Sequence, residues 1–410
     1  MNPSDSSRTV GSQRGEVLKY RDFRLLCLAT IFDAIGFMGD NLILGWLILD
    51  LTDSTLMVGL GLAVRHAPAF FLGLFAGAVA DTKDRRTIMR LLTVGNAFIA
   101  ASLAALLVSG QIQMWILLPI AVVGGALGTM NQTARQAFAW DIVGQRNVLS
   151  GLSFVSLSMR FGGMIGALAV GFVLGKVGPS AAYSLLTGGY LVSLVVLTMI
   201  RSRGQAAPKG GQPVWESVKE FGSELRRNGA LALMVLVVGL VEVLGFSTQV
   251  LMPSLARDIL NVGAEGLGIM GAFNSGGGLI AIALISPLGE LRRQGLAFLA
   301  VIHVFGLSLV LLGLASTFYL ALGAILLLSG SMALSDLFSQ TLMQRLVPNE
   351  LRGRAMGAWV VAVGTSPLGN LQIGALASVI GVGLTLVSQG AALMVLGATT
   401  LAVSARLRKL

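Results

Sequence analysis

The sequence predicts an all-α integral membrane protein whose twelve transmembrane helices form two pseudo-symmetric six-helix bundles. Composition is the first reason: of 410 residues, 55% are hydrophobic and 12% are charged, whereas soluble domains have about 25% charged residues. The mean hydropathy of +0.82 is the second reason. The third is that apolar runs of about 20 residues, the length at which a helix crosses a bilayer, recur along the chain.

Apolar runs divide the chain into two sets of six expected helices. The first set lies at residues 25–50, 56–80, 88–109, 113–134, 149–174 and 180–200. The second set lies at residues 230–254, 264–287, 295–315, 317–343, 355–379 and 383–404. Gly supplies 53 residues, near twice its usual share of about 7%, and small residues let membrane helices pack closely.

Polar segments delimit five parts of the chain. Residues 1–22 form an N-terminal arm that lacks the apolar core of a cleaved signal peptide. Residues 201–228 form a cytosolic linker that starts rich in Gly and Pro and continues at helical spacing, as an amphipathic surface helix. The two bundles are then residues 23–200 and 229–405, and a tail follows at 406–410.

Lys and Arg collect in the segments on one side of the predicted membrane. The arm, the linker, the C-terminus and every second loop hold 25 of the 29, and the opposite side has only Lys176 and Arg257. Because positive segments stay in the cytosol, both termini are predicted to be cytosolic, in a plasma or inner membrane. These short loops also account for the net charge of +10, so no nucleic-acid partner is predicted.

The two halves of the chain resemble each other. RDFRLLCLA (21–29) is similar to RNGALALMV (227–235), and DIVGQRNVLSG (141–151) is similar to RLVPNELRGRAMG (345–357). Parallel repeats of this kind predict two bundles related by an axis along the membrane normal, with a substrate path between them.

A charged turn, GAVADTKDRR, joins the second and third expected helices. On charge alone it is an ordinary positive loop, in which the aspartate ends one helix and the arginines hold the turn in the cytosol. Its order resembles the signature of the major facilitator superfamily, Gly-x-x-x-Asp-(Arg/Lys)-x-Gly-(Arg/Lys)-(Arg/Lys). The matching residues are Gly77, Asp81, Arg85 and Arg86, whereas Thr82 and Asp84 depart from the signature.

Further stretches are similar to one branch of that superfamily, which contains the enterobactin exporter, macrolide efflux pumps and transmembrane secretion effectors. These stretches are FRLL (23–26), Gly36, GWLILDLTDS (45–54), PAFFLGLFAGAVAD (68–81), RQAF (135–138), PNELRGRAMG (348–357) and PLGN (367–370). The resemblance covers nearly the whole chain. It implies the major facilitator fold and export of small molecules driven by a proton or sodium gradient.

The resemblance also implies roles for two segments. Asp81 and its neighbours would latch the two bundles on the cytosolic side, against the start of the eleventh helix near residues 353–358. The alternative is that Asp81 only caps its own loop. The stretch RFGGMIGALAVG (160–171) is similar to the glycine-rich fifth helix of antiporters, but Met164 stands where that pattern has proline, so antiport is not indicated by this stretch alone.

Six ionisable residues fall inside the apolar runs: Asp33, Asp40, Arg65, Arg160, Glu242 and Asp336. A charge in hydrocarbon costs at least a few kcal/mol, so such residues face a cavity or a partner. In the fold that the resemblance implies, their helices are those that line the central cavity or the bundle interface. The six are therefore the candidates for the substrate cavity and for proton coupling.

Depth along the helices suggests which of these charges meet. Asp40 and Arg65 both lie about 24 Å above the cytosolic end at 1.5 Å per residue, and a structural pair between them is favoured over a transport role. Asp33 lies near the midplane, with Arg160 closest in height. Asp33 is therefore the leading proton-coupling candidate, with Arg160 modulating it or binding an anionic group of the substrate, and Glu242 is its rival.

Other functional classes have little support in the sequence. No nucleophile, phosphate-loop or metalloprotease pattern is present, so no enzyme, cofactor or ATP-driven pump is predicted. Cys27 is the single cysteine, and two isolated histidines make no metal site. The prediction is a monomeric exporter of a small amphipathic molecule by proton antiport. An ion-coupled uptake symporter and a non-transporting membrane sensor or scaffold remain as alternatives.

Overall fold

The computed structural model describes residues 17–80, 84–204, 227–285, 293–347 and 352–404. These residues form helices and turns and contain no strand. Eleven helical segments among them are long and apolar enough to cross a membrane. The helix α3 (Thr55–Ala80), with 26 residues, is also of membrane length. The predicted all-α membrane fold is therefore confirmed.

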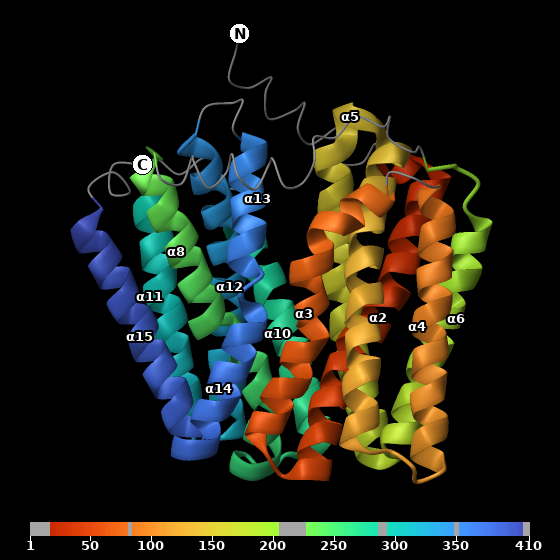
Figure 1. The fold of residues 1–410 in the computed structure, drawn as a ribbon, viewed down its shortest axis with the longest axis horizontal. Helices are drawn as coiled ribbons and strands as arrows, with labels where there is room; N and C mark the ends of the chain where they lie inside the picture. The colour runs from red at the N-terminus through yellow and green to blue at the C-terminus, as the bar shows by residue number, and fades with distance from the viewer. Residues whose placement is uncertain (1–16, 81–83, 205–226, 286–292, 348–351, 405–410) are drawn as a thin grey trace. The chain divides into compact units, whose positions relative to one another are not determined.

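The order of the helices along the chain is shown by colour in Figure 1. The first half contains η1 (Val17–Lys19), α2 (Arg21–Thr52), α3, α4 (Arg85–Val108), α5 (Met114–Lys176) and α6 (Pro179–Met199). The second half contains α8 (Gly229–Leu244), η2 (Phe246–Leu251), α9 (Met252–Ser254), η3 (Leu255–Ile259), α10 (Gly263–Ile285), α11 (Gln294–Gly313), α12 (Phe318–Arg345), α13 (Arg352–Val363), α14 (Ser366–Ile380) and α15 (Val382–Val403).

The long helix α5 contains two membrane spans separated at Gly144. Gly144 has φ 72° and ψ 169°, a backbone conformation outside the helical region that glycine adopts readily. The spans on either side are Met114–Gln145 and Ser150–Lys176. The first of them continues eleven residues beyond position 134, where the sequence analysis ended it. Arg135 therefore lies inside a helix and not in a loop.

The chain divides into two compact units (Figure 1). The first unit comprises Met1–Ile43 and Phe71–Lys209, and the second comprises Leu44–Phe70 and Gly210–Leu410. In the second unit, the end of α2 and the start of α3 contact residues from the second half of the chain. Arg257 forms an ion pair with Asp53 and donates to the Leu49 carbonyl, and the Thr55 hydroxyl donates to the Gly374 carbonyl at 3.2 Å.

Two helices of the second unit are interrupted, although the sequence analysis expected continuous spans at 230–254 and 355–379. The first changes from α-helix to 3₁₀-helix after Gly245, and Pro253, which lacks an N–H, follows eight residues later. The second breaks between α13 and α14, where Pro367 stands in the first turn of α14. Each interrupted span thus contains a proline, which cannot donate a helical hydrogen bond.

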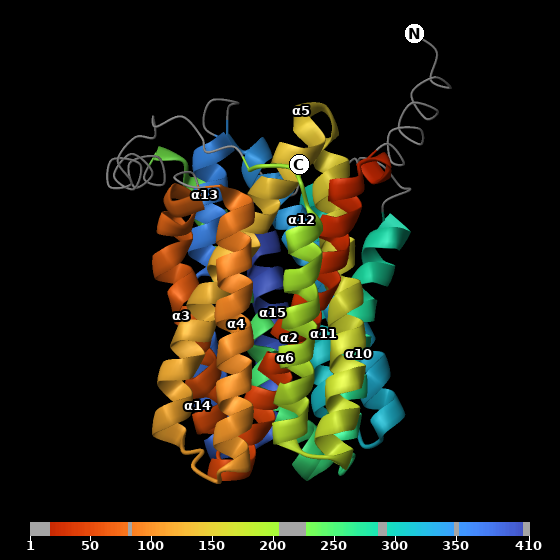
Figure 2. The ribbon, with the colours of Figure 1, turned by 90° about the vertical axis from the view of Figure 1, so that its right-hand side faces the viewer.

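Close packing in the first unit depends on two glycines of α5. A Cβ atom on Gly162 would lie 2.3 Å from the Ile31 carbonyl oxygen, and one on Gly166 would lie 2.8 Å from the Ile35 Cα. The α5 backbone therefore touches the α2 backbone directly on both sides of Asp33. In the same unit α4 packs against α6 (Figure 2) and α5, and Phe23 and Leu26 of α2 belong to one buried hydrophobic cluster with side chains of these three helices. The glycine-rich stretch 160–171 thus has a packing role.

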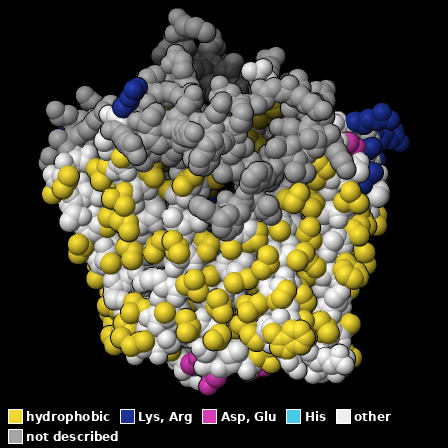
Figure 3. Space-filling view, viewed as in Figure 1, with side chains coloured by type: hydrophobic (Ala, Val, Ile, Leu, Met, Phe, Trp, Pro, Cys, Tyr) yellow, Lys and Arg dark blue, Asp and Glu magenta, His cyan; other side chains and the backbone are white. Residues whose placement is uncertain are grey.

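Hydrophobic side chains cover the flanks of the helices, and Lys, Arg, Asp and Glu gather at the helix ends (Figure 3). Large apolar side chains in mid-helix are open to the surroundings, such as Phe98 (72% exposed) and Phe172 (60% exposed). Contiguous apolar surface of this extent indicates contact with lipid. The protein is therefore a multi-pass membrane protein.

The contact between α5 and α2 makes a stability prediction. We expect Gly162→Ala to destabilise the protein by about 1–3 kcal/mol, because the added methyl group meets backbone that cannot move aside. Thermal unfolding in detergent measures the effect. Gly188→Ala in α6 is the matched control, because no atom lies within 4 Å of a Cβ at that position. Equal unfolding temperatures for both variants would contradict the packing described.

Candidate functional site

A buried ion pair joins α2 and α5 in the first unit. Arg135 Nη2 lies 2.6 Å from Asp33 Oδ2, and their side chains are only 5% and 3% exposed. The same nitrogen donates to Asn131 Oδ1 at 3.2 Å, one helical turn earlier on α5. Two opposite charges in contact, with a further hydrogen bond, offset much of the cost of removing both from water.

The ion pair leaves two polar atoms unused. Among the described residues, Asp33 Oδ1 and Arg135 Nε are buried and have no hydrogen-bond partner. The Ser193 hydroxyl lies nearby on α6, but it donates to the Ala29 carbonyl at 3.2 Å. The cluster is thus charge-balanced and incompletely hydrogen-bonded.

The cation beside Asp33 differs from the one that the sequence analysis expected. Depth along the fifth span favours Arg160, because the fourth span is expected to end at position 134 and Arg135 is then expected in the following loop. In the structure the fourth span extends to Gln145, so Arg135 is carried into the helix and reaches Asp33. Arg160 is half-buried on α5 and interacts with other groups.

The predicted pair between Asp40 and Arg65 remains a prediction. Asp40 is half-buried on the part of α2 in the first unit, and Arg65 is buried, at 4% exposed, on the part of α3 in the second unit. Both side chains have interaction partners. His66 is the next residue of α3 in the same unit, and its Nδ1 lies 3.2 Å from the Asn370 amide nitrogen on α14.

The second unit holds a different acidic site, centred on Glu242 of α8. Glu242 is 6% exposed, and no described cation forms an ion pair with it. Its carboxyl group is within hydrogen-bonding reach of the Ser366 side chain, and Asp336 of α12 interacts with it electrostatically. Two acidic side chains are therefore brought together.

The two helix interruptions of the second unit meet beside Glu242. Glu242 lies three residues before the break at Gly245, and Ser366 is the first residue of α14. The Thr365 hydroxyl donates to the Gly239 carbonyl at 3.3 Å, which joins the break before α14 to the turn of α8 that precedes Glu242. A helix N-terminus carries unpaired N–H groups and a partial positive charge, so it stabilises a nearby carboxylate. Interrupted helices of this kind form substrate and ion sites in transporters.

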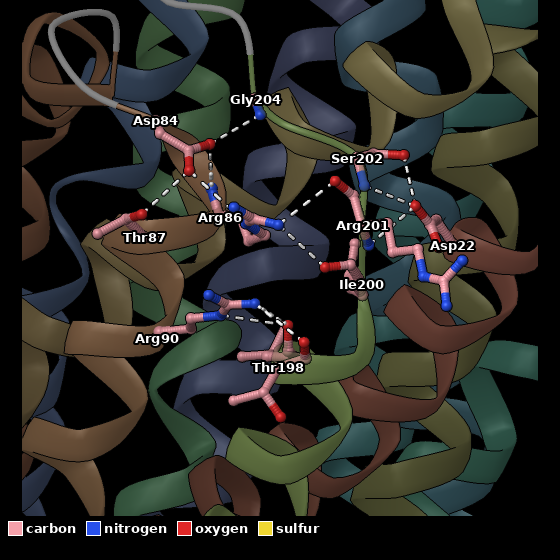
Figure 4. A network of polar contacts seen from close by, with 11 residues as sticks. Asp22, Asp84, Arg86, Thr87, Arg90, Thr198, Ile200, Arg201, Ser202 and Gly204 are labelled. Carbon is pink, nitrogen blue, oxygen red and sulfur yellow. Dashed lines mark hydrogen bonds and ion pairs between the residues drawn. The ribbon is translucent and has the colours of Figure 1, made fainter.

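The arginines of the charged turn are bound within the first unit. Arg85 Nη1 lies 2.6 Å from Asp141 Oδ1, and both side chains are 9% exposed. Arg86 Nη1 donates to the carbonyls of Ile200 (3.1 Å) and Arg201 (3.3 Å) beyond the end of α6. The Arg86 contacts fasten the start of α4 to the end of α6 (Figure 4), and the Arg85 contact fastens it to α5.

Asp84, which departs from the superfamily signature, is the N-cap of α4. Its carboxylate accepts hydrogen bonds from the Arg86 N–H (3.3 Å), the Thr87 hydroxyl (3.0 Å) and the Gly204 N–H (2.7 Å) (Figure 4). Partial burial raises the pKa of Asp84, but these hydrogen bonds outweigh it, so the pKa lies below its ordinary value. Asp84 is therefore ionised at neutral pH.

The remaining expected gate residues are only partly described. Gly77 lies in the last turns of α3, whereas Asp81 falls outside the described residues, so the proposed latch stays a prediction. Asp33, Arg85, Arg86 and Glu242 all take part in polar contacts. The sequence analysis did not single out their partners Arg135, Asp141 and Ser366 as site residues. Among the residues described, no cluster of His, Cys, Asp and Glu could hold a metal ion.

Comparison with known proteins relates the chain to transporters. A family model described as transmembrane secretion effector matches residues 17–410. The enterobactin exporter EntS of Shigella boydii serotype 4 is 28% identical over 335 residues, which cover 78% of each chain. The enterobactin exporter EntS of Escherichia coli O9:H4 is similar to the same extent.

Solved transporter structures share the fold at low sequence identity. A POT family transporter in complex with 5-aminolevulinic acid has a TM-score of 0.77 at 12% identity, over 94% of this chain and 96% of that one. The nucleoside transporter NupG has a TM-score of 0.77 at 11% identity, over 93% and 98%. These likenesses show the fold alone.

The buried ion pair predicts a large loss of stability when one partner is removed. We expect Arg135→Met to destabilise the protein by about 3–5 kcal/mol, because Asp33 is left charged without a partner. Adding Asp33→Asn should restore part of this loss. Thermal unfolding of the single and double variants tests the pair. Asp258→Asn is the control, because its pair with Arg257 is exposed and worth about 1 kcal/mol or less. Additive effects of Arg135→Met and Asp33→Asn would contradict the coupling.

The lowered pKa of Asp84 predicts a specific acid sensitivity. A group whose pKa is lower in the folded state adds stability above its unfolded value, and this stability is lost as the pH falls through the folded value. Between about pH 6 and about pH 3, Asp84→Asn should therefore lose less stability than the unmodified protein. Unfolding temperatures measured across this range test it, and parallel curves would contradict the assignment.

Proposed function

Because the chain belongs to the transmembrane secretion effector family of the major facilitator superfamily, we propose that this secondary transporter exports a small amphipathic organic molecule, drug-like or siderophore-like, in exchange for protons. As a member of that family it is a transporter and not an enzyme. The direction of transport is supported by the relatives at 28% identity, which are named as exporters of enterobactin.

Glu242 is the observation that carries proton coupling. It is buried, has no described cation in an ion pair with it and lies near a second carboxylate, that of Asp336. A Ser366 hydroxyl and the start of α14 can stabilise the ionised form without a full counter-charge. Such a carboxyl group can gain and lose a proton as its exposure to water changes, which is what coupling requires.

Asp33 becomes the second candidate for proton coupling. Its contact with Arg135 at 2.6 Å keeps the pair charge-balanced, so a proton would have to compete with a guanidinium for the same carboxylate. Breaking the pair during the cycle would expose Arg135 for an anionic group of the substrate. Arg160 no longer has this part in the proposal, because Arg135 holds the position beside Asp33.

The remaining parts of the proposal concern placement in the membrane. The distribution of Lys and Arg supports a plasma or inner membrane location with both termini in the cytosol. The transporter is proposed to act as a monomer, with lipid around it and a proton as the coupling ion. Reporter fusions at the two termini test the orientation.

Substrate class is tested with the purified protein. A thermal-shift screen against catecholate siderophores, macrolides and cationic dyes identifies which class stabilises the folded state, because a bound ligand raises the unfolding temperature. Accumulation of a hit inside inside-out vesicles, dependent on a pH gradient, supports export. Loss of that accumulation when a sodium gradient alone is imposed supports protons as the coupling ion.

Replacing the two candidate carboxyl groups separates their roles. We expect Glu242→Gln to abolish accumulation driven by a pH gradient while retaining exchange of labelled for unlabelled substrate, because exchange needs no net proton movement. Asp33→Asn should retain a pH-dependent component. Measurements in proteoliposomes decide between them. Full gradient-driven transport by Glu242→Gln, together with its loss in Asp33→Asn, would overturn the assignment of Glu242.

A further inference from the structure

The residues Ile200–Gly204, named here the linker anchor, follow α6 and open the connection between the two halves of the chain. Asp22, in the first turn of α2, holds the middle of the linker anchor (Figure 4). Its Oδ2 accepts hydrogen bonds from the Arg201 N–H at 3.1 Å, the Ser202 N–H at 2.7 Å and the Ser202 hydroxyl at 2.6 Å. One carboxylate oxygen thus fixes two consecutive residues.

The start of α4 holds the two ends of the linker anchor. Asp84 Oδ1 accepts from the Gly204 N–H at 2.7 Å, and Arg86 donates to the Ile200 and Arg201 carbonyls. Asp84 and Arg86 are themselves in contact, with Nε 3.6 Å from Oδ2. The backbone donors and acceptors of the linker anchor therefore meet opposite charges on α4, and hydrogen bonds to charged groups are the stronger kind.

Gly204 is packed as well as hydrogen-bonded. A Cβ atom at this position would lie 2.7 Å from both the backbone nitrogen and the Cβ of Arg85. A side chain would therefore push the linker anchor off α4, since the nearest atoms include backbone. The N–H of Gly204 reaches Asp84 only because the two backbones touch.

This arrangement of contacts requires an acceptor side chain at position 84. The superfamily signature has glycine there, and a glycine would offer no acceptor to Gly204 and no contact to Arg86. The segments that meet are far apart in sequence, 120 residues for Asp84 and Gly204 and 180 residues for Asp22 and Ser202. Two acids from different helices thus converge on one short stretch of backbone.

We propose that Asp84 and Asp22 are positioning residues that fix the linker anchor to the first unit, and that this fastening narrows the range of distances that the two units sample; the second part of the inference rests on the proposed transport function. The fastening also keeps Arg86 bound at the end of α6 while the units move. In the transport cycle, the fastening makes the linker anchor move together with the rest of the first unit.

Limited digestion with trypsin tests the fastening without knowledge of the substrate. Cleavage after Arg201 and Arg203 requires release of the linker anchor, so its rate follows the released population. We expect about ten-fold faster cleavage in Asp84→Gly and in Gly204→Ala, which loosen the same contact from opposite sides. Asp84→Asn should cleave at nearly the original rate, because its amide oxygen still accepts. Gly229→Ala is the control near the other end of the linker, where no atom lies within 4 Å of a Cβ.

Pulsed electron paramagnetic resonance tests the role in the cycle. Spin labels on Val177 in the first unit and Leu314 in the second, both more than two-thirds exposed, report the distance between the units in a Cys27→Ser background. We expect a broader distance distribution in Asp84→Gly and Gly204→Ala than in Asp84→Asn or Gly229→Ala. Cleavage at the original rate in both loosened variants would overturn the proposal. Faster cleavage with unchanged distance distributions would also overturn it, because the fastening would then have no part in the movement of the units.

Discussion

The free energy of burying charge away from water is the constraint on which the rest of this structure depends. An unpaired charge in hydrocarbon costs at least a few kcal/mol, so every acid inside a span needs compensation. The two units meet this need differently. Asp33 lies against Arg135 at 2.6 Å, whereas Glu242 lies beside Ser366 at the start of α14. In the first arrangement a guanidinium balances the charge of the carboxylate, whereas in the second the carboxyl group has only a hydroxyl and a helix terminus beside it. The first arrangement favours a structural role for Asp33, and the second favours proton coupling at Glu242.

In both units, the backbone conformation places the buried acidic residues beside their partners. In the first unit, glycines of α5 bring its backbone against α2 on both sides of Asp33. In the second unit, the helix breaks after Leu244 and before Ser366 place a helix terminus beside Glu242. Close approach and interruption are both possible inside a membrane only where neighbouring helices cover the backbone. The polar sites and the irregular backbone therefore depend on each other.

The sequence allowed the helices and the buried acids to be predicted, but not their partners. Hydropathy identifies twelve spans because length and composition alone decide whether a helix crosses a bilayer. It does not locate the ends, and the eleven residues between position 134 and Gln145 correspond to about 16 Å along a helix. Because of that difference, Arg135, which was expected in a loop, lies in the helix and contacts Asp33. The breaks at Gly245 and Pro367 were visible as residue types, but averaging over a span hides them. The contacts of Asp22 and Asp84 join residues more than a hundred positions apart, and no local pattern records them.

The contacts of the charged turn limit what substitutions in that turn can show about gating. Its arginines match a signature associated with gating, yet in this chain Arg85 is occupied by Asp141 and Arg86 by the end of α6. Both contacts lie inside the first unit. Replacing either arginine would therefore loosen that unit even if no gate existed, and a loss of transport alone would not demonstrate a latch. Only a residue of the turn that makes no such contact within the first unit can report on gating by itself. Asp84 does not meet this condition either, because it is already committed to the cap of α4 and to the linker anchor.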